Sequence, residues 1–314
     1  MYDVCCLAGS PNLLANTDDR IKTNLRRAIL EHDTPVLFDW LVERFNYQGV
    51  SDATAASFIR HNALVRWHDL ERLLDESQEC AKLGSFWSFY NCRYDKTLQS
   101  CAQPALFKGC VLPRHELRNG RLSQLVYSFY LFIRDIAERD LVGWLDRQVE
   151  LNESGSHGDP GEALVHALRG VFGVSDKVLA MALSDLFLAA PVEKRAWRNI
   201  GCKLIAVDTL VHAFLHRTGI LAAYKADHPY SRACYGHNGC AAVLRHLSGL
   251  IDARVFNSSY PRHFARFVQH AIWRFCAADG LNICNGNQID DSAACQNSYC
   301  RLHARCEKRV LRQK

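Results

Sequence analysis

Four cysteines near the C-terminal end of the sequence have the residue type and spacing of a metal-binding loop. Cys284, Cys295, Cys300 and Cys306 have ten, four and five residues between successive members. Thiolates bind tetrahedral zinc, and they also bind the iron atoms of iron–sulfur clusters. The spacing therefore predicts a metal site at these side chains, either zinc or an iron–sulfur cluster, in preference to four unrelated thiols.

A second set of candidate ligands is Cys92, Cys101, Cys110 and His115. They lie in a segment from about residue 80 to residue 120, in which aromatic, cysteine and turn residues mix without a clear period. A segment with little apolar content gains folding free energy from a bound metal. We therefore expect either a second metal site here or buried free thiols.

Cys234 and Cys240 lie on either side of His237 and could bind a metal, but we favour a loop that lies over DNA or over the protein core. The sequence contains 14 cysteines. It begins without the basic and apolar segments of a signal peptide, so we interpret the cysteines as thiols or metal ligands rather than disulfides.

A lysine follows a short turn in the segment Gly173-Val174-Ser175-Asp176-Lys177, which leads into an apolar helix. The first backbone N–H groups of a helix have no partner within the helix, and the helix dipole favours negative charge there. The turn therefore predicts a phosphate-binding site. The alternative is an ordinary loop with a solvated Lys177.

Asp208 ends an apolar run and precedes an amphipathic segment that continues to Arg217. Aspartate is favoured immediately before a helix because its carboxylate accepts hydrogen bonds from free N–H groups. Asp208 is therefore expected at a helix N-cap. A purely structural cap is the alternative to a catalytic carboxylate.

Helices are expected to position all of these side chains. Apolar residues recur at three- and four-residue spacing through most of the chain, and sustained alternation of the strand type is scarce. The pattern predicts an all-α fold. With 314 residues and 48% hydrophobic residues, the chain can form one large or two modest domains.

Together these motifs resemble the helix-hairpin-helix DNA glycosylases, especially endonuclease III and its adenine-glycosylase relatives. The segment 173–177 resembles the hairpin, Val207-Asp208-Thr209 with Arg217-Thr218 resembles the aspartate segment, and the four-cysteine loop follows in the same order. The segment 46–53 is similar to a stretch whose glutamine, here Gln48, fills the gap left by an extruded base. Ser175 stands where the family has the second hairpin glycine.

The resemblance implies a two-lobed all-α fold. One lobe would span residues 34–197 and contain the helix-hairpin-helix motif and the insert at about 80–120. The other would join residues 1–33 to residues 198–314. The resemblance also implies that the four C-terminal cysteines hold a [4Fe-4S] cluster, with zinc as the alternative.

The implied activity is excision of a damaged or modified base from double-stranded DNA, followed by strand cleavage at the abasic site. The base must leave the helix stack before it can react. Asp208 would stabilise the positive charge of the reacting sugar, and Lys177 would attack the sugar as a nucleophile. The remaining residues implied to contact DNA are Gln48, Gly173, Ser175 and Arg217.

The formal net charge of +5 is compatible with a nucleic-acid partner. No run approaches the roughly 18 to 20 apolar residues of a membrane span. We therefore expect a monomer without a membrane partner, in the cytoplasm with the nucleoid, or in the nucleus. Two other classes stay open: a non-catalytic DNA-binding module and a zinc-stabilised interaction protein.

Overall fold

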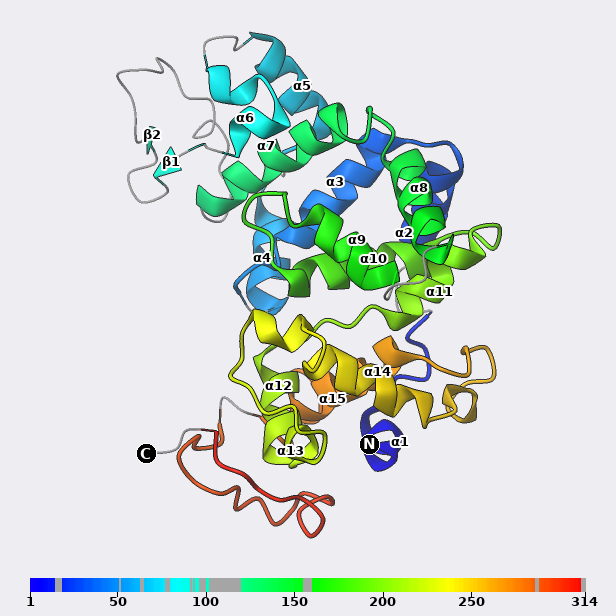
Figure 1. The fold of residues 1–314 in the computed structure, drawn as a ribbon, viewed down its shortest axis with the longest axis vertical. Coiled ribbons are helices and arrows are strands. Elements are labelled where there is room, and N and C mark those ends of the chain that lie inside the picture. The colour runs from blue at the N-terminus through cyan, green and yellow to red at the C-terminus, as the bar shows by residue number, and fades with distance from the viewer. Residues whose placement is uncertain are drawn as a thin grey trace. The chain divides into compact units, whose positions relative to one another are not determined.

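The computed structural model describes residues 1–14, 19–50, 52–62, 65–76, 80–90, 92, 94–95, 100–101, 120–154, 160–285 and 288–311. Helices dominate these residues (Figure 1). The sheet in the described part is one antiparallel pair, β1 (Tyr94–Asp95) and β2 (Ser100–Cys101). The all-α prediction is confirmed.

The chain forms two compact units. Unit 1 consists of Met1–Asp18, Leu183–Leu188 and Arg198–Lys314, and unit 2 of Asp19–Ala182 and Ala189–Trp197. Helix α2 (Asp19–Leu30) belongs to unit 2. The sequence instead predicts that residues 1–33 join the C-terminal part of the chain.

Unit 2 contains most of the helices before residue 190. Besides α2 they are α3 (Thr34–Phe45), α4 (Asp52–His61), α5 (Trp67–Glu76), η1 (Ala81–Leu83), α6 (Phe86–Phe89), α7 (Gly120–Asp135), α8 (Leu141–Ser154), α9 (Pro160–Leu168) and the start of α10 (Asp176–Ala189). Helix α11 (Arg195–Lys203) begins in unit 2 and ends in unit 1.

Aromatic side chains from α3, α5 and α7 form the core of unit 2. The Phe38 ring lies 5.4 Å from the rings of both Phe129 and Trp67, and the Trp67 and Tyr130 rings are 4.5 Å apart. All four side chains are buried. Burial of one large apolar side chain contributes about 1.5–3 kcal/mol, so these contacts hold the three helices together.

A tight turn joins α9 to α10 in unit 2. Gly173 has a φ of +81°, a backbone conformation that favours glycine. Ser175 then accepts the first helical hydrogen bond of α10, at its carbonyl, from Leu179 N. The Arg169 guanidinium holds the buried Asp176 carboxylate through two hydrogen bonds, of 3.0 and 2.7 Å. The turn expected at residues 173–177 is therefore present and is fixed from both sides.

Unit 1 is built around helix α15 (Ala265–Cys276), against which α1 (Tyr2–Ala8), α12 (Thr209–Arg217) and α14 (Cys240–Gly249) pack (Figure 1). The shorter helices of unit 1 are α13 (Ile220–Ala223), η3 (Arg232–Tyr235) and η4 (Ala253–Val255). The hydroxyl of Tyr260 donates to the Ser10 carbonyl at 2.6 Å and accepts from Leu13 N at 2.7 Å. These bonds fix the N-terminal segment to the C-terminal part of the chain.

The described helices are short compared with a bilayer. Helix α7 has 16 residues, whereas a membrane span needs about 20. Within the described ranges, none of the helices combines the length and the apolar character that a membrane crossing requires.

His270 on α15 gives a pH prediction. Burial lowers its pKa to about 3, and the charges of Arg266 and Arg274 act in the same direction. An unfolded histidine titrates near 6.5, so between pH of about 6.5 and 3 the unfolded chain binds more protons and stability falls as the pH falls. From pH 7 to pH 5 this histidine should remove about 2 kcal/mol of unfolding free energy.

A phenylalanine at position 270 cannot bind a proton but keeps a ring beside Trp273. The His270→Phe variant should therefore lose about 2 kcal/mol less unfolding free energy than the wild type between pH 7 and pH 5. Urea unfolding of both proteins at pH 7 and pH 5 measures the difference. Equal losses in the two proteins would contradict the assignment to His270.

Candidate metal centre

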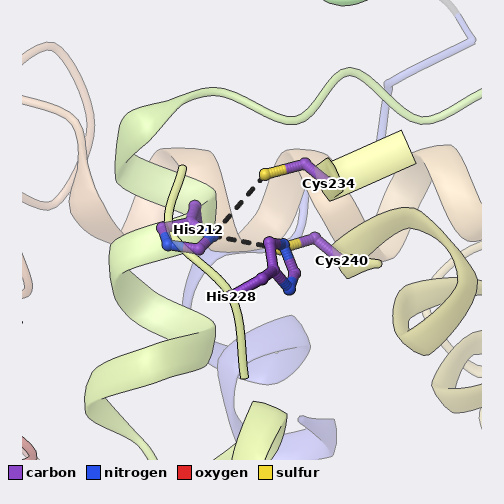
Figure 2. Close-up of side chains that lie close together, drawn as sticks. All are labelled: His212, His228, Cys234 and Cys240. Atoms are coloured by element: carbon purple, nitrogen blue, oxygen red, sulfur yellow. Dashed lines mark hydrogen bonds between the residues drawn. The ribbon is translucent and has the colours of Figure 1, made fainter. Parts of the chain in front are cut away.

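Two histidines and two cysteines of unit 1 converge on one point (Figure 2). His212 lies on α12, His228 in the loop after α13, Cys234 in η3, and Cys240 is the first residue of α14. Their four ligand atoms all lie within 4.8 Å of one another. We call these four residues the His/Cys group.

Three distances within the His/Cys group are those of ligands around one ion. His212 Nδ1 lies 3.3 Å from Cys240 Sγ and 3.6 Å from Cys234 Sγ, and His228 Nε2 lies 3.5 Å from Cys240 Sγ. Nitrogen and sulfur ligands of a tetrahedral zinc lie about 3.3 to 3.8 Å from each other, as follows from metal–ligand distances of about 2.0 to 2.3 Å. The group could therefore hold a metal ion with little rearrangement.

The orientation of His228 also suits a metal ligand. Its Nδ1 lies 2.6 Å from the Ala226 carbonyl, which fixes the proton on that nitrogen. Nε2, the atom that faces Cys240, is then left with a lone pair. Histidines that bind metals usually donate their other ring N–H to such a second partner.

The sulfur atoms are inside the protein. Cys234 and Cys240 are 0% exposed and His212 is 6% exposed. Hydrogen bonds from Cys240 and His212 lower the pKa of Cys234, and the same bond between the thiols raises the pKa of Cys240. A buried thiolate requires a compensating positive charge, which a bound metal would supply.

The turn between the two cysteines depends on Gly239. A Cβ atom at this position would lie 2.2 Å from the Ala233 carbonyl oxygen and 2.6 Å from the carbonyl carbon of Cys234. No side chain fits at such distances. The absence of a side chain at Gly239 allows the backbone to bring Cys240 next to Cys234.

Part of this group can be predicted from the sequence. Cys234 and Cys240 are candidate ligands there together with His237, which is exposed in the structure, but a loop without metal is the favoured interpretation. The structure places His212 and His228 beside them instead. His212 is 28 residues from Cys240, too far for a local motif, and the available signal was a histidine within the buried apolar run of α12.

The four C-terminal cysteines also lie near one another. Burial raises the pKa of Cys306, and the charges of Cys284, Cys295 and Cys300 raise it further. All four thiols are half-buried, and Cys284 and Cys300 pack against the core of unit 1. An iron–sulfur cluster distributes its thiolates over several metal ions, so they need not approach as closely as the ligands of a single ion.

A fifth thiol joins this loop. Cys276, the buried last residue of α15, is hydrogen-bonded to Cys284. The bond raises the pKa of Cys276 and lowers the pKa of Cys284. Cys276 ends a helix, outside the loop that holds the other four, so the spacing of the loop cysteines does not reveal it.

Arg217 is not on a surface that could contact DNA, contrary to the expectation from the sequence. Its side chain is 1% exposed, and its Nη2 donates to Asp291 at 2.7 Å. Its carbonyl accepts from Arg309 N at 3.0 Å and from Cys306 Sγ at 3.6 Å. Burial therefore assigns Arg217 to the support of the cysteine loop.

The other expected site residues lie in local settings that fit the sequence analysis. Asp208 is the N-cap of α12, and its Oδ1 accepts from Val211 N at 2.8 Å. In unit 2, Lys177 is half-buried on the first turn of α10. The Oε1 of Gln48 accepts from Ser175 N at 3.1 Å and from Ser175 Oγ at 2.8 Å, so two expected DNA contacts adjoin each other.

The second metal set is described only in part. Cys110 and His115 lie outside the described residues. Burial raises the pKa of Cys92, and the charges of Cys80 and Cys101 raise it further, so these three thiols are neighbours. The metal site proposed for the insert stays a prediction.

Comparison with protein-family models, with curated proteins and with solved structures finds no match to this chain. The resemblance to helix-hairpin-helix glycosylases therefore rests on the motifs themselves.

Gly239→Ala tests the turn that joins the two cysteines. Overpacking typically costs about 1–3 kcal/mol, and we expect a loss of this size together with lower metal content. Urea unfolding and metal analysis measure both effects.

Gly249→Ala, at the opposite end of α14, is the matched control, because a Cβ there meets nothing within 4 Å. This change should be neutral, or stabilising by up to about 1 kcal/mol. Wild-type stability and metal content in Gly239→Ala would refute the close-approach argument.

Proposed function

We propose that the protein is a DNA glycosylase with abasic-site lyase activity, which extrudes and excises a damaged or modified base from double-stranded DNA. The observation that carries the proposal is the setting of helix α12. Asp208 caps its N-terminal end, and Arg217 at its other end contacts the cysteine loop. The resemblance requires this order of carboxylate, helix and cysteine loop.

The turn before α10 supports the DNA-binding part of the proposal. It leads with a positive-φ glycine into the N-terminus of a 14-residue helix, where phosphate binding is favoured. Gln48 lies against this turn through its bonds to Ser175. A side chain that fills the gap in the duplex must lie close to the residues that hold the DNA backbone, and Gln48 meets this requirement.

The setting of Asp208 suits electrostatic stabilisation. The N-terminus of α12 favours a negatively charged carboxylate, and such a charge stabilises the cation-like sugar formed as the glycosidic bond breaks. Lys177 would then attack the sugar carbon, and the bonding electrons would leave with the base, which takes up a proton from the attacking amine. Breaking of the bond between that carbon and the ring oxygen would convert the adduct to an imine, which allows the strand to break by elimination.

The C-terminal loop fits the [4Fe-4S] cluster that the resemblance implies. Five thiols lie in or beside this loop, and a cluster would need four of them as ligands. They are Cys276, Cys284, Cys295, Cys300 and Cys306. Arg217 adds a second observation, because its buried Nε and Nη1 have no hydrogen-bond partner among the residues that the structure describes. Donors aimed at cluster sulfurs are a common means of stabilising such a cluster. When bound, the cluster would crosslink a loop whose described residues, 277–285 and 288–311, form no helix or strand.

A metal-stabilised binding module is the second candidate function. The His/Cys group favours it, because structural metal sites stabilise binding domains as well as enzymes. Such a module would bind DNA or protein without releasing any base.

Substitutions of Lys177 and of Asp208 should impair different steps of the proposed reaction. Lys177→Gln should abolish borohydride trapping and strand cleavage, because no amine remains to form the imine. Asp208→Asn should slow base release by about 100-fold or more, because it removes the charge. Asparagine is as good an N-cap as aspartate, so stability should be nearly unchanged.

Asp208→Ala is the control for the cap, and it should lose about 1 kcal/mol of stability as well as activity. The assay uses a panel of duplexes with defined lesions, scored with and without alkali and borohydride. Trapping by Lys177→Gln would place the nucleophile elsewhere. An unaltered rate in Asp208→Asn would leave Asp208 with the structural role alone.

The cluster itself is tested by purification without oxygen. We expect a yellow-brown protein with iron and sulfide, because four thiolates bind a [4Fe-4S] cluster. Cys276 and the four loop cysteines are each replaced by serine, one at a time, and the ligands are the four whose replacement removes the iron. Cys202→Ala, at a buried thiol outside both groups, should keep it. A colourless protein with zinc in the loop would refute the cluster.

A further inference from the structure

We propose that His212, His228, Cys234 and Cys240 bind one Zn²⁺ as a closed structural site, and that this site fixes the backbone that carries Asp208. The first part stands on the His/Cys group alone. The second part rests on the proposed function, in which Asp208 is catalytic.

The donor set favours zinc over other metals. Two thiolates and two imidazoles in a tetrahedral arrangement are typical of zinc, whereas calcium and magnesium require oxygen ligands. With both thiols deprotonated and both histidines neutral, the ligands carry two negative charges, which balance Zn²⁺. A neutral site is the one that the burial of both cysteines permits.

The site is closed because the protein supplies all four ligands. Catalytic zinc sites keep one position for water or substrate, and structural sites do not. A cleft of about 680 Å³ in unit 1 is lined by His212, His228 and Tyr230, among others, and gives the metal a path of entry. Metal binding would release the two thiol protons to solvent through the same cleft.

A short chain of contacts connects the site to Asp208. Tyr235 follows the ligand Cys234 in η3. Its hydroxyl accepts from Val207 N at 2.8 Å and donates to the Val207 carbonyl at 3.2 Å. The Tyr235 side chain, next to the proposed ligand Cys234, therefore holds both the N–H and the carbonyl of Val207. Val207 directly precedes Asp208.

The cleft beside the site also reaches the start of α12. Tyr230 lines it, and the Tyr230 ring lies 5.7 Å from the His212 ring. Thr209, the residue after Asp208, lines the same cleft. The proposed zinc ligands and the N-terminal end of α12 therefore border one cleft within unit 1.

Zinc content of the purified full chain tests the site. His228→Ala removes one of the four ligands, so it should reduce bound zinc by about one ion per chain. The variant should still fold, because His228 is a half-buried loop residue and its replacement removes no core packing. His228→Cys should retain the zinc, since three cysteines and one histidine also form a zinc site. Cys202→Ala is the matched control and should keep the wild-type content.

Three results would overturn the zinc site. They are equal zinc content in the wild type and His228→Ala, absence of zinc from both, and a Cys234–Cys240 disulfide in the native protein by mass spectrometry. Reconstitution with Co²⁺ adds a spectroscopic check. The wild type should show the visible bands of a tetrahedral cobalt thiolate site, and His228→Ala should lose them.

Hydrogen exchange tests the link to Asp208 without any activity assay. The Val207 amide should exchange at least tenfold faster in Tyr235→Phe and in His228→Ala, whereas the amides of α15 should not change. Tyr235→Phe should retain its zinc. Unchanged exchange at Val207 in both variants would disprove the positioning role and leave the zinc site standing.

Base release separates the two proposals. If the enzyme is active, Tyr235→Phe should slow base release in the wild-type background and add nothing in the Asp208→Asn background. The absence of base release from every duplex tested would refute the proposed function, while zinc content and exchange at Val207 would still decide the inference made here.

Discussion

A buried histidine is the constraint on which unit 1 depends. His212 projects from α12, where its neighbours Val211, Phe214 and Leu215 form part of the apolar core. A buried polar group without partners costs about 1–3 kcal/mol, so an imidazole here needs polar contacts. They come from cysteines 22 and 28 residues away in sequence. The chain after α13 must therefore return over α12, and this return shapes the whole segment between α13 and α14.

The same helix organises two other polar groups. Asp208 caps its N-terminal end and Arg217 lies at its last turn, about 14 Å apart at the rise of an α-helix. Near the middle of the helix, His212 contacts the cysteines of the His/Cys group. At its C-terminal end, Arg217 contacts Asp291 and Cys306 of the cysteine loop. A carboxylate on such a helix is held more rigidly than one on a free loop, and preorganised electrostatic catalysis requires this rigidity.

The features predicted correctly from the sequence are local ones. The N-cap at Asp208 and the turn at Gly173 depend on residues within three or four positions, and helical periodicity is equally local. The contacts that were missed join distant segments. His228 meets Cys240 across a loop, Cys276 meets Cys284 beyond a helix end, and Arg217 is buried by residues 74 to 92 positions later in the chain. Spacing alone carries no information about such contacts.

If the resemblance holds, Ser175 stands where the family has the second hairpin glycine, and this difference has a physical consequence. Ser175 offers both its N–H and its hydroxyl to Gln48 Oε1, whereas a glycine would offer the N–H alone. A phosphate oxygen that binds this N–H must take the place of the Gln48 oxygen, because one N–H makes one strong hydrogen bond. In the proposed reaction, docking of the DNA backbone on this N–H would therefore remove one of the two bonds between Ser175 and Gln48 and leave the bond from the hydroxyl. The serine hydroxyl thus supplies Gln48 with a contact that a glycine could not supply when DNA is bound.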